Sequence, residues 1–225
     1  MPDISKINNV AVADISKLDA VTFAHGQKVN NQDVSLVTDA HVLISTATAE
    51  EDSELTFHHG INGVVFDSTY DVYEFVFTNI HPQNSGGSAQ LLWQANAAGG
   101  ADFDENIQST AFRAYHQEDG SGGAVDYRTG EDQATADEVY EIIMEGIHND
   151  NDTSGSGMLT LYAPSSTTYV KHFMSVANTT LTAGTKQDFH GGYINTTSAI
   201  DEISFKMTSG NIDSGVIKMY GLAKS

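Results

Sequence analysis

The sequence lacks cysteine and is poor in basic residues, and each deficit excludes classes of protein. With no cysteine among its 225 residues, the chain has no disulfide framework, no thiolate zinc site, no iron–sulfur cluster and no cysteine nucleophile. Ten basic residues against 30 acidic ones give a formal net charge of −20. Because phosphate contacts need lysine and arginine, this charge argues against nucleic acid and anionic membranes as partners.

Long apolar runs are also missing from the sequence. No run of about 18 apolar residues is present, so we expect no segment that spans a membrane. The first residues, MPDIS, have neither the basic region nor the apolar region of a signal peptide. The length is sufficient for one domain with a sizeable core, with or without a tail.

The acidic charge is concentrated in the middle of the chain. Residues 29–170 contain 23 of the 30 acidic residues and only two basic ones, Arg113 and Arg128. The flanking residues 1–28 and 171–225 contain seven acidic residues and eight lysines. One interpretation is a solvated acidic surface that keeps the protein soluble. The other is that the neutral ends contact another protein while the acidic middle faces solvent.

The N-terminal segment repeats with a period of 11 residues. Residues 3–10 read DISKINNV, residues 14–21 read DISKLDAV, and a weaker third copy places Lys28 in register with Lys6 and Lys17. Such a period fits a right-handed helical supercoil or short extended segments joined by Asn and Asp turns, and the Val, Ile and Asn content favours the second.

So short a segment needs a partner surface, or identical chains around an axis, to bury its apolar side chains; a duplicated, frayed tail is the alternative. We predict an N-terminal arm over residues 1–32 and a body over residues 33–225. The residues of the arm that are candidates for anchoring it are Ile4, Lys6, Ile7, Ile15, Lys17, Leu18, Lys28 and Val29.

The body has the pattern of short β-strands. Residues 72–78 alternate, with Tyr73, Phe75 and Phe77 on one face, and similar runs are separated by clusters of Gly, Ser, Asn and Asp. Residues 139–144 have apolar positions that also suit a helix, but their β-branched and aromatic content favours a strand. Strands without βαβ alternation predict an all-β, antiparallel β-sandwich with a jelly-roll-like arrangement.

Three stretches of the body resemble bacteriophage virion proteins. The C-terminal stretch 200–222 reads IDEISFKM, a turn SGNIDSG, and VIKMYGL; the other two are YDVYEFVF at 70–77 and LTLYAPSS at 159–166. The N-terminal repeat resembles the leader of marine phage structural proteins. The group that the chain resembles includes capsid decoration (cement) proteins, head fibres and tail-fibre components, which are non-enzymatic, commonly jelly-roll-like and usually trimeric.

The resemblance implies a structural protein on the exterior of a virion, in the capsid or the tail. Because an extended shaft is missing, we expect a capsid decoration protein that docks through its arm on the major capsid protein or other virion proteins and acts as a homotrimer. The alternative is a tail-fibre or head-fibre component that binds a host glycan, and the third possibility is a carbohydrate-active enzyme. No cofactor is expected.

Two sets of residues are candidates for ligand binding. Aromatic side chains near the glycine-rich segment 119–123 could stack on a sugar, although core packing is their commoner use; they are Trp93, Tyr115, His116 and Tyr127. Asp150, Asp152 and Ser154 imitate the start of a Ca²⁺ loop. An EF-hand needs Glu at its twelfth position, which is Leu161 here, so only a looser Ca²⁺ site or a polar turn remains.

Other motifs with catalytic or ligand-binding chemistry are weak or missing. The oxygen-rich group Asp102, Asp104 and Glu105 is a second candidate for Ca²⁺, and the adjacent His58 and His59 would point to opposite faces of a strand. The sequence has no GxSxG elbow, HExxH motif, P-loop or GxGxxG fingerprint. We therefore expect that the protein is not an enzyme.

Overall fold

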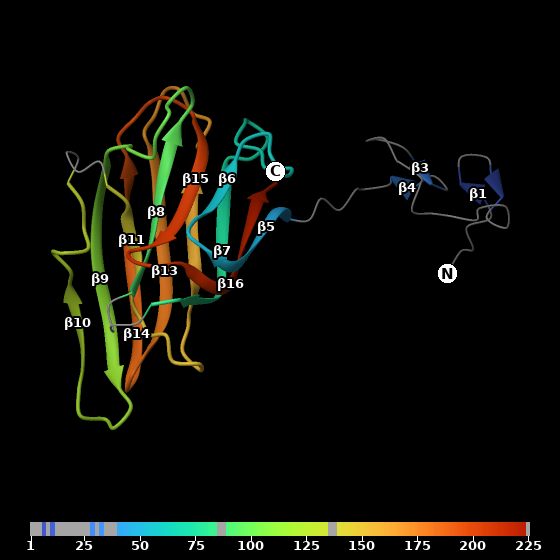
Figure 1. Cartoon of the computed structure of the whole chain (residues 1–225). Coiled ribbons are helices and arrows are strands. Elements are labelled where there is room, and N and C mark those ends of the chain that lie inside the picture. Colours follow the sequence, from blue (N-terminus) through green and yellow to red (C-terminus); the bar gives the residue numbers. More distant parts are fainter. Residues whose placement is uncertain are drawn as a thin grey trace. The chain divides into compact units, whose positions relative to one another are not determined.

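The computed structural model of the chain divides into two compact units, Met1–Asp39 and Ala40–Ser225 (Figure 1). It describes residues 40–84, 89–134 and 139–223, together with four two-residue strands in the first unit. All regular elements among the described residues are strands, and these residues contain no helix that could cross a membrane. The prediction of an all-β chain is confirmed.

The four strands of the first unit follow the sequence repeat. They are β1 (Lys6–Ile7), β2 (Val10–Ala11), β3 (Lys28–Val29) and β4 (Gln32–Asp33). β1 pairs with β2 and β3 pairs with β4, both antiparallel, and the two pairs are two repeats apart in the sequence. The predicted anchor residues Ile4, Ile15, Lys17 and Leu18 lie outside the described residues, and the predicted boundary between residues 32 and 33 stays a prediction.

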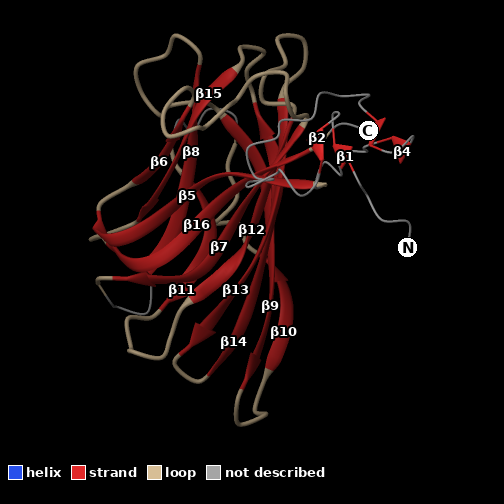
Figure 2. Ribbon diagram, turned by 90° about the vertical axis from the view of Figure 1, so that its right-hand side faces the viewer, coloured by secondary structure: helices blue, strands red, loops and turns tan. Residues whose placement is uncertain are grey.

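The second unit is an antiparallel β-sandwich (Figures 1 and 2). The large sheet has eight strands in the order β10-β9-β14-β13-β12-β7-β16-β5, and the small sheet has four in the order β11-β8-β15-β6. The strands are β5 (His41–Asp52), β6 (Leu55–His58), β7 (Val72–Pro82), β8 (Ala89–Ala97), β9 (Ile107–Gln117), β10 (Gly123–Tyr127), β11 (Glu141–Ile147), β12 (Gly155–Tyr162), β13 (Lys171–Leu181), β14 (Gly184–Ile194), β15 (Ile200–Met207) and β16 (Ile212–Leu222).

The pairing of these strands has a regular order. β5, β6, β7 and β8 pair with β16, β15, β12 and β11 respectively, and successive pairs alternate between the large and the small sheet. The hairpins β9–β10 and β13–β14 are added to the large sheet beyond β12. Because β11 packs against β13 and β14, the strands β9 and β10 continue the large sheet past the edge of the small one.

Aromatic side chains from both sheets form the core. Tyr73, Phe75 and Phe77 of β7 are all buried, as their alternation predicted. The ring of Phe75 meets Phe57 of β6 and Phe205 of β15 at centroid distances of 5.3 and 5.4 Å. Burying each such side chain contributes roughly 1.5–3 kcal/mol, so this cluster holds the two sheets together.

The strand boundaries differ from the sequence prediction at some places. β11 confirms that the segment near residue 140 is a strand and not a helix. The turn predicted at residues 209–215 is shorter, because β16 begins at Ile212, which is buried and pairs with Pro82 and Asp52.

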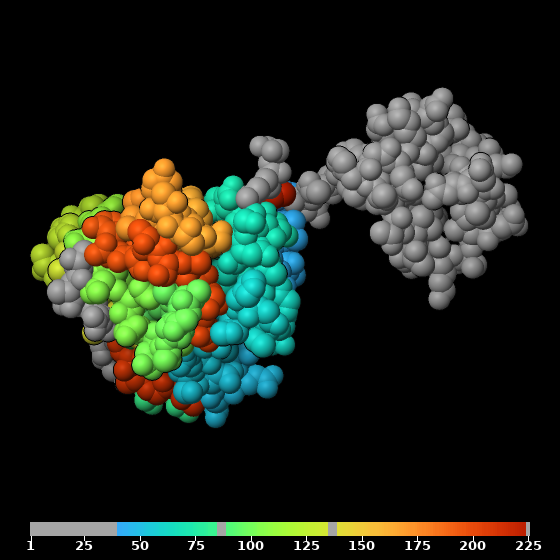
Figure 3. Space-filling view, turned by 90° about the horizontal axis from the view of Figure 1, so that it is seen from above, coloured from blue at the N-terminus to red at the C-terminus, as the bar shows by residue number. Residues whose placement is uncertain are grey.

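Loops from distant parts of the chain meet at one end of the sandwich. The backbone N–H of Ala98 donates to the carbonyl oxygen of Ala199 (2.7 Å), and that of Ile200 donates to Pro164 (2.9 Å). Figure 3 shows this end from above, with the green segment near residue 100 beside the orange segments that follow β12 and β14. These bonds fix the loop ends without help from a disulfide.

Candidate functional site

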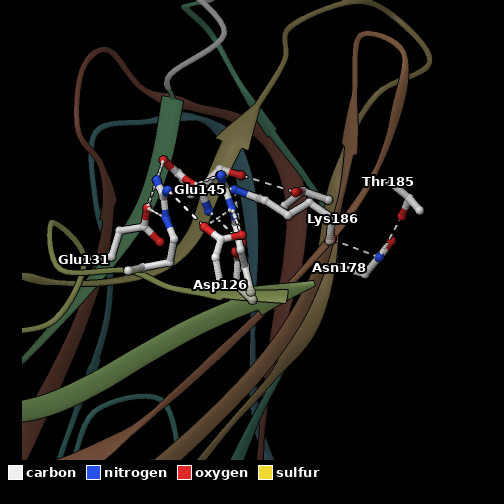
Figure 4. Close-up of polar contacts among 10 residues, drawn as sticks. Asp126, Glu131, Glu145, Asn178, Thr185 and Lys186 are labelled. Atoms are coloured by element: carbon white, nitrogen blue, oxygen red, sulfur yellow. Dashed lines mark hydrogen bonds and ion pairs between the residues drawn. The ribbon is translucent and has the colours of Figure 1, made fainter. Parts of the chain in front are cut away.

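A network of charged side chains lies on the inner face of the large sheet, where β11 covers β14 (Figure 4). Arg113 extends from β9, Lys186 and Asp188 from β14, and Glu145 from β11. The end of β10 and the loop after it add three more members, Asp126, Arg128 and Glu131. The network therefore joins the two added hairpins to the edge of the small sheet.

Glu145 is the centre of this network. Its Oε2 accepts from Lys186 Nζ at 2.8 Å and lies 3.4 Å from Arg113 Nη1, and its Oε1 lies 3.0 Å from Arg128 Nη2. Lys186 is 2% exposed, so its charge depends on protein partners and not on water. Arg128 also contacts Glu131, with Nη2 2.6 Å from Oε1.

The environment moves the carboxyl pKa values in opposite directions. Burial opposes ionisation of Glu145, but the hydrogen bond and charge of Lys186, together with Arg128, lower its pKa to about 2. Burial raises the pKa of Asp188, although the charge of Lys186 and the backbone N–H of Glu145 oppose this. Burial likewise raises the pKa of Glu131, against the hydrogen bond from Arg128. Glu145 is thus the member held as a carboxylate.

A second pair of titratable groups lies deeper on the same face. The Nδ1 atom of His190 on β14 is 3.6 Å from Oε1 of Glu141 on β11, and the two side chains are 1% and 0% exposed. Burial raises the pKa of Glu141, and His190 opposes this shift. A substrate in solution would not reach this pair, and within the described residues neither the ring nitrogens of His190 nor the carboxylate oxygens of Glu141 have a hydrogen-bond partner.

Three carboxylates of the network lie close enough together to be considered as a metal site. One oxygen from each of Glu131, Glu145 and Asp188 lies within 4.8 Å of the others. However, Arg128 and Lys186 already bind oxygens of all three residues. A metal ion would have to displace these cations, so the donor set does not fit one well. The adjoining pocket of about 210 Å³ is lined by Arg113, Tyr115, Gln117, Glu145, Gly146, Leu181 and Lys186.

The opposite face of the same sheet has a different character. On the five strands β12, β13, β14, β9 and β10, the outward-facing residues include no Asp, Glu, Lys or Arg. We call this surface the uncharged face. Its residues are Ser156, Met158, Thr160 and Tyr162; His172, Met174, Val176, Asn178 and Thr180; Thr185, Gln187, Phe189, Gly191 and Tyr193; Gln108, Thr110, Phe112, Ala114 and His116; and Gly123, Val125 and Tyr127.

The uncharged face also gathers exposed apolar side chains. Of the ten large apolar side chains that are exposed among the described residues, six lie on it: Phe112, Val125, Tyr127, Met158, Met174 and Val176. The register aligns a row across the sheet, from Met158 through Val176, Phe189 and Phe112 to Tyr127. Within this row the rings of Phe112 and Phe189 stack with their centroids 4.6 Å apart.

The structure separates the four residues predicted to contact a glycan. Trp93 is wrong as a candidate because it is 0% exposed and packs against Phe173 in the core, with ring centroids 4.9 Å apart. Tyr115 is half-buried, under the guanidinium of Arg113, and lines the pocket beside the network. His116 and Tyr127 are exposed and lie on the uncharged face. No single site therefore unites the four.

The predicted Ca²⁺ loop forms the turn between β11 and β12. The backbone N–H and the hydroxyl of Thr153 both donate to the carbonyl oxygen of Asp150, which is the bonding of a polar turn. Asp152 and Ser154 line a pocket of about 290 Å³ together with Asn79, His81 and Ser214. The Ca²⁺ site at Asp150, Asp152 and Ser154 stays a prediction.

The second oxygen-rich group has a structural use at one of its members. Glu105 accepts a hydrogen bond from the backbone N–H of Ala97 at 3.1 Å, and its own carbonyl accepts from the amide of Gln94. Burial raises the pKa of Glu105, although the bond from Ala97 opposes this. These contacts fix the segment between β8 and β9.

Comparison of the chain with family models, with curated proteins and with solved structures found no match. The network, the uncharged face and the sequence are therefore the features that bear on function.

Proposed function

We propose that the chain is a non-enzymatic structural protein of a bacteriophage virion, and that it serves as a capsid decoration protein. The resemblance of residues 70–77, 159–166 and 200–222 suggests this role. The strand pairing supports it, because eight strands pair as β5–β16, β6–β15, β7–β12 and β8–β11 in alternating sheets. We infer that the sandwich is a jelly roll whose large sheet is widened by two hairpins.

One observation carries the proposal, namely the uncharged face on a chain of net charge −20. A freely diffusing acidic protein distributes charge over its surface, which keeps it soluble and monomeric. A broad face without charge, with Phe, Tyr and Met exposed on it, has the composition of the central part of a protein interface. Such a face is expected of a protein that works by assembling with others.

The buried network supports a mechanical role. Its three cations bind carboxylates within the chain, and the His190–Glu141 pair is sealed from solvent. These contacts stabilise the widened part of the large sheet against separation from the small sheet. In a decoration protein this would let the body bridge neighbouring shell subunits without losing its shape, while the arm over residues 1–32 docks on the shell.

A fibre component that binds a host glycan is the second candidate. The exposed Tyr127 and His116 on the uncharged face favour it, because aromatic rings on a flat face are able to stack on sugars. The two roles differ in abundance. A decoration protein is expected at a copy number near that of the shell subunits, whereas a fibre component is expected in a few copies per particle.

The experiment quantifies this chain in purified particles by mass spectrometry and then tests the arm. Particles that lack the protein are mixed with the full chain or with a chain lacking residues 1–32, and co-sedimentation is measured. We expect near-stoichiometric binding of the full chain and none of the shortened chain, with unchanged circular dichroism of the body. A variant with residues 1–32 in permuted order is the control for length and composition. Absence from particles would contradict the proposal, and saturating binding by the shortened chain would contradict the role of the arm.

A further inference from the structure

The most informative feature beyond this proposal is the shape and composition of the uncharged face. Its strands have a regular register, so its side chains form rows across the sheet. The central row from Met158 to Tyr127 is bulky. The next row runs from Thr160 through Met174 and Gly191 to Thr110, and Gly191 contributes no side chain. A ridge at the stacked Phe112 and Phe189 therefore lies beside a notch at Gly191.

We propose that the uncharged face is the surface through which two copies of this chain associate. The inference goes beyond the location in a virion, because it concerns the contact of the chain with itself, and it puts a two-fold contact in place of the homotrimer that the resemblance implies. A ridge beside a notch on one surface is self-complementary. Under a two-fold axis the ridge of each copy enters the notch of the other, as an isologous interface requires.

Charge decides in favour of a second copy over a different partner. Two chains of net charge −20 repel each other wherever acidic surface meets acidic surface, and like-charge juxtaposition costs several kcal/mol. The strands of this face present no charge, and the Asp132 carboxylate lies only at its edge, where it accepts from the Tyr127 hydroxyl (2.6 Å), so most of this repulsion is absent on self-association. A basic partner would gain nothing from it, since such a partner would be attracted to the acidic surface. The polar groups that remain, such as Asn178, Gln187 and Thr110, form hydrogen bonds without bringing net charge into the contact.

The size of the face is adequate for a specific contact. Five strands about 4.8 Å apart give a width of about 20–25 Å. β9, β13 and β14 have 11 residues each, which gives a length of about 30–35 Å at about 3.3 Å per residue, while β12 with 8 residues and β10 with 5 are shorter. The resulting area of roughly 600–800 Å² approaches the roughly 800 Å² per partner of a standard interface.

Sedimentation velocity of the full chain tests the proposal. We expect the wild-type chain to sediment as a dimer or a larger assembly at micromolar concentration. Thr110→Glu with Met174→Glu places two charges on either side of Gly191, at residues that are exposed in the isolated chain. We expect a dissociation constant raised about 100-fold or more, as like charges at a contact imply.

The matched control adds the same charge to the same sheet outside the uncharged face. Thr46→Glu with Thr48→Glu changes two exposed residues on the edge strand β5. We expect less than a twofold change in the dissociation constant. Both double variants are checked for an unchanged circular dichroism spectrum at the temperature of the experiment, so that loss of association is not confused with unfolding.

A second readout locates the contact without adding charge. Because the chain has no cysteine, a single Thr110→Cys or Thr46→Cys substitution creates a unique thiol. At concentrations where the chain associates, we expect Thr110→Cys to react with a maleimide at least tenfold more slowly than on dilution, and Thr46→Cys to react at one rate.

Several outcomes would overturn the proposal. One is a wild-type chain that stays monomeric at a concentration 100-fold above the micromolar range. Another is an equal change in the dissociation constant for the two double variants. The third is that Thr110→Cys and Thr46→Cys react with maleimide at equal rates where the chain is concentrated. If the chain is a monomer and binds a glycan array, and Tyr127→Ala abolishes this binding, the uncharged face is instead a sugar-binding surface. Absence from virions would refute the proposed function and leave this inference standing. A chain that is present in virions but monomeric would support the proposed function and refute this inference.

Discussion

Glu145 shows how a single residue holds the widened sheet to the rest of the sandwich. It comes from the edge strand of the small sheet and binds cations from β9, from β14 and from the loop after β10. Surface ion pairs contribute little, but Lys186 is almost fully buried, and removing its partner would leave a charge in the interior. The energetic effect of Glu145 is therefore expected to exceed that of an exposed acidic residue.

Replacing Glu145 by Gln should lower the free energy of unfolding by roughly 3 kcal/mol at pH 7. The pKa of Glu145 is about 2 in the folded chain and 4.5 when unperturbed. Its contribution is thus fully present above pH 4.5 and is lost as the pH falls towards 2. Urea unfolding of wild type and variant at pH 7, 5 and 3 should show a difference that shrinks at pH 3.

Glu118→Gln is the control, since Glu118 is exposed in the loop between β9 and β10. It should change the stability by less than about 0.5 kcal/mol. Three carboxyls have raised pKa values, so their effect on stability changes with pH in the opposite direction; they are Glu131, Glu141 and Asp188. Both proteins contain these three groups, so the difference between variant and wild type isolates the titration of Glu145. An equal deficit at pH 7 and pH 3 would show that the ionised form is not what matters.

The sequence indicates only part of this network. Arg113 and Arg128 are conspicuous as the two basic residues within an acidic stretch, but their partner Glu145 is one of many acids there. Lys186 and Asp188 lie in the C-terminal flank and reach the network only because β14 pairs with β9. Trp93 was misjudged for a related reason: it was grouped with aromatic residues near segment 119–123, whereas β8 runs through the small sheet and buries it.

At the scale of an element, β14 shows how closely the added hairpins are fitted. It carries adjacent glycines, Gly191 and Gly192, which face opposite sides of the sheet. A Cβ atom on Gly192 would lie 2.1 Å from the carbonyl oxygen of Gln108 and 2.8 Å from Cα of Ser109. A Cβ atom on Gly191 would meet nothing nearer than the carbonyl oxygen of Phe173 at 3.8 Å. The close approach of β9 therefore requires glycine at only one of the two positions.

Gly192→Ala should destabilise the chain by about 2–3 kcal/mol, because the backbone of β9 has to shift. Gly191→Ala is the matched control and, on the dissociated chain at low concentration, should stay within about 0.5 kcal/mol of wild type. Thermal and urea unfolding, followed by circular dichroism, measure both. Similar effects of the two substitutions would mean that β9 and β14 are not paired in this register.

The sequence predicted the strands better than their partners. Alternation found the buried face of Tyr73, Phe75 and Phe77, and the β-branched content near residue 140 correctly favoured a strand. The uncharged face was missed, although its signal is in the sequence: every second residue of β13 and β14, from His172 to Thr180 and from Thr185 to Tyr193, lacks charge. It becomes visible only when these strands are placed beside β9, which precedes them by many residues.

For the whole molecule, the distribution of charge follows the faces of the sheets and not the windows of the sequence. The acidic middle of the chain supplies Glu131, Glu141 and Glu145 to the interior, and it also supplies β9, β10 and β12 to the uncharged face. An outward-facing acidic middle between neutral ends is therefore too simple. Because strands alternate their side chains, a strand with charges on one side and none on the other averages to an ordinary composition.

This separation predicts how salt acts on the chain. The acidic surface repels itself within one chain and between two chains, and added salt screens this repulsion as the Debye length falls from about 30 Å at 0.01 M to about 3 Å at 1 M. If association uses the uncharged face, no attractive charge pairs are lost on screening. Raising NaCl from about 0.02 M to about 0.5 M should then raise the melting temperature and also strengthen self-association. Thermal unfolding and sedimentation velocity across this range measure the two effects, with KCl at equal ionic strength as the control for ion-specific binding. Association that weakens as salt is added would mean that charged groups meet across the contact, and the uncharged face would then not be the surface that two copies share.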